Sequence, residues 1–226
     1  MPLPRPRLVV LFLLLATLLR AGSLESAFQV RAMLGPGVWS RVLRMENDRA
    51  GRGSRYPAEF HGLLVAFEDR LWLYTEFDGT QSLSLQAGRL EQDRADPGPL
   101  LRAVDPGLTR FADVTDRPPA SLPDGLPPRH CFPASVRRWQ QLHAEANPPE
   151  RARLLAYYPW AKPGGHMVLE YWREGRRFLF DPDDPGRDRE LPARLDEDPL
   201  RVAQALFRPD DRKRPMRAMH LDLSGA

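Results

Sequence analysis

The feature that most limits how this chain can fold is a pair of alternating segments that meet at Glu174-Gly175. Apolar residues recur at every second position from His166 to Trp172 and again from Arg177 to Asp181. A period of two is typical of strands, and a short connection containing glycine favours a tight hairpin. One face of the hairpin is uncharged and consists of Met167, Leu169, Tyr171, Phe178 and Phe180. The sequence therefore predicts two antiparallel strands with one core face.

The opposite face of this hairpin gathers the polar residues. A turn of two or four residues places Trp172 opposite Arg177, and residues at even spacing then share a face. His166 and Asp181 become diagonal neighbours, about 5.5–8 Å apart before their side chains extend. Asp183 would lie directly opposite His166 and is the rival carboxylate. The same face carries Glu170 and Arg177.

The only cysteine of the chain, Cys131, lies where a helix is predicted to begin. Pro133 suits a first helical turn, and Asn147-Pro148-Pro149 ends the helix. A buried stripe at helical spacing is predicted from Phe132, Val136, Trp139 and Leu142 or His143. Cys131 falls at the edge of this stripe. The positive end of a helix favours a thiolate, and a nearby imidazole can hold the resulting ion pair.

A lone cysteine cannot form an internal disulfide. Cys131 is therefore a reactive thiol, half of an intermolecular bridge, or a buried structural residue. The histidine and aspartate at the predicted spacing favour the reactive thiol.

These residues resemble the transglutaminase-like branch of the papain-like cysteine enzymes. The matching motifs are Cys131-Phe-Pro-Ala134, Gly165-His166-Met-Val-Leu-Glu170 and Phe180-Asp181-Pro182. The resemblance implies an α+β fold with a papain/transglutaminase-like core, in which the cysteine-bearing helix packs on an antiparallel sheet. It also implies that Cys131 is the nucleophile, His166 the base and Asp181 the orienting carboxylate.

The expected function is that of a thiol hydrolase or acyltransferase acting on peptide or isopeptide bonds. The oxyanion donor would be the backbone N–H of Cys131 or the side chain of Gln81, the one glutamine in a predicted strand upstream. The alternative is a catalytically inactive binding or structural module of the same fold. Two features favour that alternative: His130 directly precedes the cysteine, and no glutamine lies between residues 93 and 139 to stabilise the oxyanion.

The first 23 residues are expected to be a signal peptide. Arginines precede an apolar block from Leu8 to Leu19, which is shorter than the roughly 20 residues of a membrane span. We therefore expect an exported, periplasmic or extracellular protein without stable membrane insertion. Of the 33 basic residues, three lie in this segment, so 30 would remain against 30 acidic residues. A balanced charge argues against nucleic acid as a partner and leaves a protein or peptide substrate.

The region 24–112 is predicted to be mostly β. Two strands turn at Glu68-Asp69, and a third follows Asp78-Gly79, which gives a small antiparallel sheet. Residues 28–50 could form two strands or a strand and a helix. His61 is expected to be a partly buried structural histidine.

The region 113–226 is expected to be the catalytic one. It adds a helix near Pro199–Phe207 and a final edge strand. The five histidines are scattered and there is no cysteine pair, so neither a metal nor a cofactor is expected.

Overall fold

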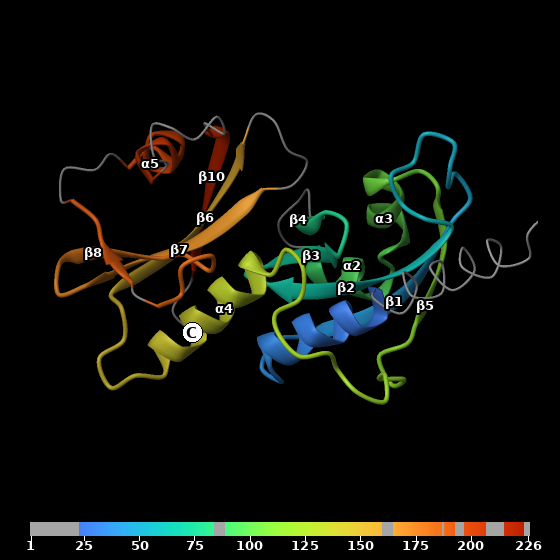
Figure 1. Ribbon diagram of the computed structural model, residues 1–226, viewed down its shortest axis with the longest axis horizontal. Helices are drawn as coiled ribbons and strands as arrows, with labels where there is room; N and C mark the ends of the chain where they lie inside the picture. The colour runs from blue at the N-terminus through green and yellow to red at the C-terminus, as the bar shows by residue number, and fades with distance from the viewer. Residues whose placement is uncertain are drawn as a thin grey trace, which may run out of the picture. The chain divides into compact units, whose positions relative to one another are not determined.

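Backbone pairing divides the chain into two units (Figure 1). The computed structural model describes residues 23–83, 89–159, 165–186, 188–192, 197–206 and 215–223, so the predicted signal peptide lies outside the described residues apart from its last position. The first unit runs mainly to Pro128 and the second begins at Arg129, with residues 33–37 and 78–80 also grouped with the second. Each unit contains helices and an antiparallel sheet, which confirms the α+β class.

The first unit has a sheet of strand order β4-β3-β2-β1-β5. Its elements after a helix over residues 23–34 are β1 (Ser40–Asn47), β2 (Glu59–Phe67), β3 (Arg70–Thr75), β4 (Gly79–Ser82), α2 (Leu90–Ala95), α3 (Gly98–Val104) and β5 (Leu108–Asp113). The predicted turn at Glu68-Asp69 is confirmed, since both residues have positive φ and join β2 to β3. The region left open by the sequence is a helix followed by a strand.

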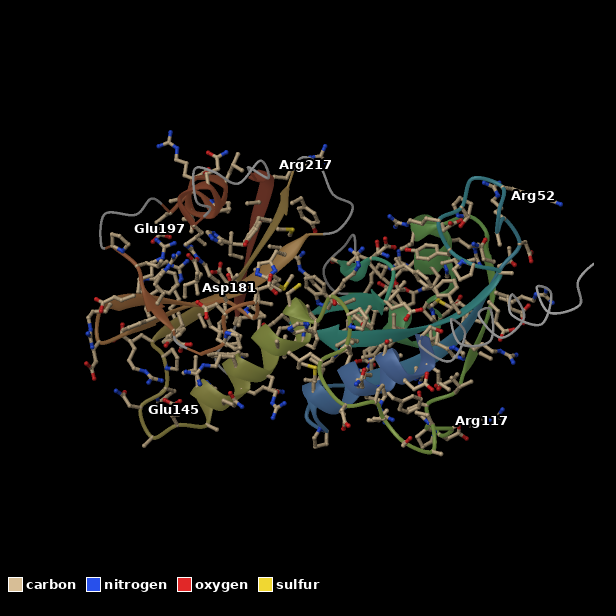
Figure 2. The ribbon with its side chains drawn as sticks, viewed as in Figure 1. Arg52, Arg117, Glu145, Asp181, Glu197 and Arg217 are labelled. Atoms are coloured by element: carbon tan, nitrogen blue, oxygen red, sulfur yellow. The ribbon has the colours of Figure 1, made fainter. Side chains whose placement is uncertain are left out.

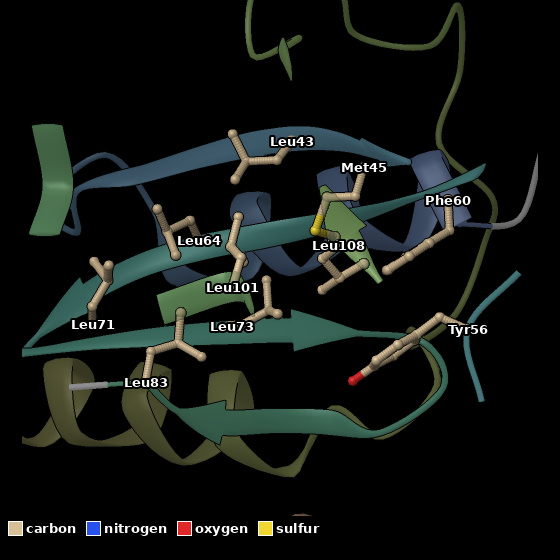
Figure 3. Close-up of a cluster of buried hydrophobic side chains, with 10 residues drawn as sticks. All are labelled: Leu43, Met45, Tyr56, Phe60, Leu64, Leu71, Leu73, Leu83, Leu101 and Leu108. Atoms are coloured by element: carbon tan, nitrogen blue, oxygen red, sulfur yellow. The ribbon is translucent and has the colours of Figure 1, made fainter. Parts of the chain in front are cut away.

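One buried apolar cluster of the first unit lies on one side of this sheet (Figure 3). Tyr56 stacks on Phe60 with ring centroids 4.9 Å apart, and Leu101 of α3 packs over the strands. His61 lies on β2, where its Nδ1 is 3.2 Å from the hydroxyl of Ser23. Burial lowers the pKa of His61, which fits the structural role expected for it.

The second unit has a sheet of order β10-β6-β7-β8-β9, in which each strand is antiparallel to its neighbours. Its elements are α4 (Cys131–His143), β6 (Arg151–Pro159), β7 (His166–Arg173), β8 (Arg176–Phe180), β9 (Arg189–Glu190), α5 (Pro199–Leu206) and β10 (Pro215–Leu223). The predicted C-terminal helix is confirmed up to Leu206, and β10 is the predicted edge strand.

The register of the β7–β8 hairpin is the predicted one. Trp172 pairs with Arg177, and Glu170 pairs with Leu179. Glu174 and Gly175 both adopt positive φ, at 53° and 67°, as a tight hairpin turn requires. The parity argument for His166 and Asp181 therefore holds.

Helices cover both faces of these strands (Figure 1). On one face, α5 packs on an apolar cluster that includes Leu155, Val168 and Leu179. On the other, α4 lies against β7, where the Ser135 hydroxyl donates to the Met167 carbonyl at 3.3 Å. Val168 shares a face with His166, so α5 covers part of the face that carries His166.

Candidate active site

Cys131 is the first residue of α4 and is partly exposed. His130 is the N-cap and makes no side-chain capping hydrogen bond. The buried side of the helix is the predicted stripe of Phe132, Val136, Trp139 and Leu142. This stripe fixes the rotation of α4, and the first turn holds Cys131 at the rim of the packed surface.

His166 is the first residue of β7 and pairs with Tyr157 of β6. Its ring meets the Tyr157 ring edge-on, with centroids 5.4 Å apart. The side chain is 19% exposed, so the imidazole is packed but still open to solvent. A position at the end of a strand lets the ring reach past the sheet toward the start of α4.

Asp181 follows the last residue of β8 (Figure 2). Its Oδ1 is 2.8 Å from Nε2 of His166, which makes Asp181 the carboxylate that orients the ring. The same Oδ1 accepts the backbone N–H of Asp183 at 3.0 Å. Oδ1 of Asp181 therefore accepts two hydrogen bonds, and Nε2 carries the proton that it donates to Asp181.

The thiol acts on the same imidazole. Cys131 is among the groups that raise the pKa of His166, and because Asp181 occupies Nε2, Nδ1 is the ring nitrogen left open to the sulfur. Burial alone would lower the pKa of His166, but its hydrogen bonds to Asp181 and Cys131 and the negative charge of both raise it to about 10. The imidazole is thus cationic near neutral pH. The pKa of Asp181, which burial would raise, is lowered by the His166 hydrogen bond.

Two tyrosines at the end of β6 are affected by the charges of the candidate site. Burial, followed by the negative charge of Asp181, Asp183 and Cys131, raises the pKa of Tyr157. Burial and Cys131 raise the pKa of Tyr158, which is 41% exposed. Both phenols stay protonated, so they can donate hydrogen bonds near the sulfur but cannot act as bases at neutral pH.

Gly165 holds the backbone next to these tyrosines. A Cβ on this residue would lie 2.9 Å from the Tyr157 carbonyl oxygen and 2.8 Å from a ring carbon of Tyr158. Glycine is thus required by the close approach of β6, and the chain can place His166 at the first position of β7.

Two oxyanion donors were expected from the sequence, Gln81 and the backbone N–H of Cys131. Gln81 donates its side-chain amide to the Tyr56 hydroxyl at 3.1 Å, inside the first unit. The N–H of Cys131 belongs to the first turn of α4, where backbone donors have no acceptor within the helix. It is therefore the better placed of the two.

Three donor groups near the thiol could hold a metal ion. The ligand atoms of His166, Asp181 and Asp183 all lie within 4.8 Å of one another, and Asp183 Oδ2 is 3.7 Å from Nδ1 of His166. No metal was expected from the sequence, because its histidines are scattered and it has no cysteine pair. The sequence signal for this group is the pair Asp181 and Asp183 at the end of the strand beside His166.

A buried ion cluster lies on the same face of the sheet, farther along the strands. Glu170 is fully buried and bonds Arg153 and Arg177, each at 2.6 Å. His220 of β10 approaches Glu170 at 3.3 Å, and the Trp172 ring contacts both guanidinium groups. This cluster was not predicted, and it ties together β6, β7, β8 and β10.

Comparisons with protein-family models, with curated proteins and with solved structures found no match. Among the residues that the structure describes, no helix is both long and apolar enough to cross a membrane.

Proposed function

We propose that this protein is a thiol-dependent hydrolase or acyltransferase that acts on amide bonds in peptides or proteins. The observation that carries the proposal is the 2.8 Å hydrogen bond between His166 and Asp181, together with the thiol at the start of α4 that raises the pKa of the same imidazole. A thiol at a helix start, a cationic imidazole and a half-buried carboxylate bonded to it are the parts that nucleophilic catalysis by cysteine needs. The resemblance to the transglutaminase-like branch of the papain-like enzymes supports the same assignment.

The first half-reaction forms a thioester. The sulfur of Cys131 attacks the amide carbonyl carbon, and the carbonyl oxygen takes up negative charge beside the N–H of Cys131. His166 then gives its Nδ1 proton to the leaving amine as the carbon–nitrogen bond breaks. Asp181 keeps the ring in one orientation throughout, because it accepts the N–H of Nε2.

The second half-reaction releases the acyl group. Neutral His166 accepts a proton at Nδ1 from water or from an amine as either attacks the thioester carbon. Water gives hydrolysis and an amine gives transfer, and the sulfur leaves as a thiolate in both. The proposal includes action outside the cytoplasm, which is supported by the leader-like residues 1–23.

Alkylation of Cys131 by iodoacetamide between pH 5 and pH 9, followed by intact mass, tests the proposal. The chain has a single cysteine, so every adduct reports this thiol. An ordinary thiol reacts faster as pH rises toward about 8.5. We expect the rate for Cys131 to be close to its plateau already below pH 7, because His166 is cationic and adjacent.

The matched variants are His166→Ala and His143→Gln, the latter at the other end of α4. His166→Ala should slow alkylation at pH 6.5 by on the order of tenfold, whereas His143→Gln should leave it unchanged. An ordinary thiol profile that ignores the loss of His166 would refute the proposal and favour the inactive binding module.

A further inference from the structure

We infer that Asp188 is a positioning residue, which holds the helix that carries Cys131 against the strand that carries His166. One oxygen of its carboxylate, Oδ2, accepts a hydrogen bond from the Arg138 guanidinium and another from the Tyr171 hydroxyl, each at 2.6 Å. These contacts need only the geometry of the second unit, whereas their effect on catalysis rests on the proposed function.

The two hydrogen bonds of Asp188 join three segments of the chain. Arg138 belongs to α4, and Tyr171 belongs to β7. Asp188 itself lies directly before β9, in the connection that begins at Asp181. The thiol, the imidazole and the orienting carboxylate of the candidate active site each come from one of these three segments. One side chain therefore ties together the elements on which the site is built.

The Asp188 carboxylate is largely removed from water. Its side chain is 15% exposed, and that of Arg138 is 28% exposed. Tyr171 is buried, and its ring stacks on Phe178 with centroids 5.3 Å apart. Burial and the bond to Asp188 raise the pKa of Tyr171 to about 12, so the phenol remains a donor at neutral pH. Hydrogen bonds to a charged group are among the stronger ones, and losing this acceptor would leave a buried donor without it.

These bonds also set which end of α4 lies at which end of β7. The Ser135 hydroxyl donates to the Met167 carbonyl, and farther along both elements Arg138 and Tyr171 meet at the shared carboxylate. The order along the helix is thus the order along the strand. The start of α4, with its thiol, lies toward the start of β7, where His166 is. Apolar packing alone has no preferred direction, so the polar contacts fix this alignment.

A second link between the same two elements provides a matched control. Glu145 lies just after α4, and its carboxylate is 2.7 Å from the guanidinium of Arg173, the last residue of β7. The Glu145 side chain is 41% exposed, whereas that of Asp188 is 15% exposed. Exposed ion pairs contribute little to stability. Glu145→Gln should therefore leave α4 docked.

Hydrogen–deuterium exchange of the full chain, measured by mass spectrometry, tests the positioning. In Asp188→Ala the amides of α4 should exchange faster by on the order of tenfold, because the loss of a charged hydrogen-bond partner favours local detachment of the helix. The amides of β6 should exchange as in the unmodified protein. Asp188→Asn keeps an acceptor oxygen and should give a smaller increase, and it supplies the same measurement if Asp188→Ala does not fold. Glu145→Gln should give no increase.

The pH profile of Cys131 alkylation by iodoacetamide tests the consequence for the site. A substitution that only lowered overall stability would leave the midpoint of this profile where it is. Asp188→Ala should move the midpoint toward the ordinary thiol value of about 8.5, because the thiol is no longer held near the imidazole. Asp188→Asn should move it less, and Glu145→Gln should keep the profile of the unmodified protein.

The inference is overturned if the α4 amides of the Asp188 variants exchange as those of Glu145→Gln do. It is also overturned if α4 loosens but the midpoint of an activated thiol does not move, since Asp188 would then have a structural role only. An ordinary alkylation profile in the unmodified protein would reject the proposed function. Faster exchange of α4 in the Asp188 variants would still support the positioning of the helix in that case.

Discussion

Replacing Glu170 by glutamine should strongly destabilise the second unit. The carboxylate is fully buried and lies 2.6 Å from both Arg153 and Arg177, while His220 approaches it at 3.3 Å. Glutamine keeps the shape of the side chain but removes its charge. Two guanidinium groups, each less than a tenth exposed, would then share a neutral partner.

The magnitude follows from the structure in two ways. Removing one partner of a buried ion pair costs about 3–5 kcal/mol. Independently, burial would raise the pKa of Glu170, but hydrogen bonds from His220 and Arg153 and the charges of Arg153 and Arg177 lower it from 4.5 to about 2. At about 1.4 kcal/mol per tenfold change in proton affinity, this lowering is worth on the order of 3 kcal/mol of folding free energy.

The pH dependence has a definite sign. A carboxylate with a lowered pKa in the folded state stabilises the fold fully above its ordinary pKa of 4.5, and this stabilisation is lost as the pH falls toward 2. The difference in unfolding free energy between the unmodified protein and Glu170→Gln should therefore be largest at pH 7. At pH 3 less than half of it should remain.

Urea denaturation followed by far-ultraviolet circular dichroism at both pH values measures these differences. Glu174→Gln is the control, because Glu174 is 65% exposed and faces Arg176 at 3.6 Å. An exposed pair of this kind contributes about 0–1 kcal/mol. If Glu170→Gln costs no more than Glu174→Gln, or costs the same at pH 3 as at pH 7, the account of the buried cluster is wrong.

Two further predictions concern the candidate active site. Asp181→Asn should slow alkylation of Cys131 at pH 7 by about tenfold, because a charge-assisted hydrogen bond to His166 becomes a neutral one. Asp184→Asn is the control. Equal alkylation rates for the two variants would contradict the role of Asp181. Gly165→Ala should lower the unfolding free energy by about 1–3 kcal/mol and also slow alkylation, since its Cβ would overlap the Tyr157 carbonyl. Gly37→Ala is the control, because its Cβ would meet nothing within 4 Å. In the same thermal-unfolding and alkylation assays it should change neither the stability nor the alkylation rate. Equal losses for Gly37→Ala and Gly165→Ala would contradict the packing argument.

The hairpin could be predicted because its information is local. A two-residue period and a turn containing glycine fix the pairing of Trp172 with Arg177, and the face shared by His166 and Asp181 follows. The start of α4 could be predicted for the same reason, since Pro133 and the apolar stripe act within one helix. The contact between Cys131 and His166 joins two such local elements, and the family resemblance gave their order.

The buried ion cluster could not be predicted, because its partners come from distant strands. Glu170 meets Arg153 only through the pairing of β6 with β7, and it meets His220 only because β10 joins the far edge of β6. The approach of Asp183 to Nδ1 of His166 depends on the backbone of a short loop, which residue types alone do not determine. The helix over residues 23–34 could not be told from a strand, because its repeat of apolar residues covers only a few positions.

The three residues of the candidate active site differ in how far apart they lie along the chain. His166 and Asp181 belong to one hairpin, so their contact closes a short loop and forms with the local fold. The thiol arrives only when α4 docks on β7, where Ser135 bonds the Met167 carbonyl. If α4 alone detached, the thiol would leave the imidazole while the sheet stayed folded. Mild denaturant should therefore abolish the reactivity of Cys131 before it unfolds the strands.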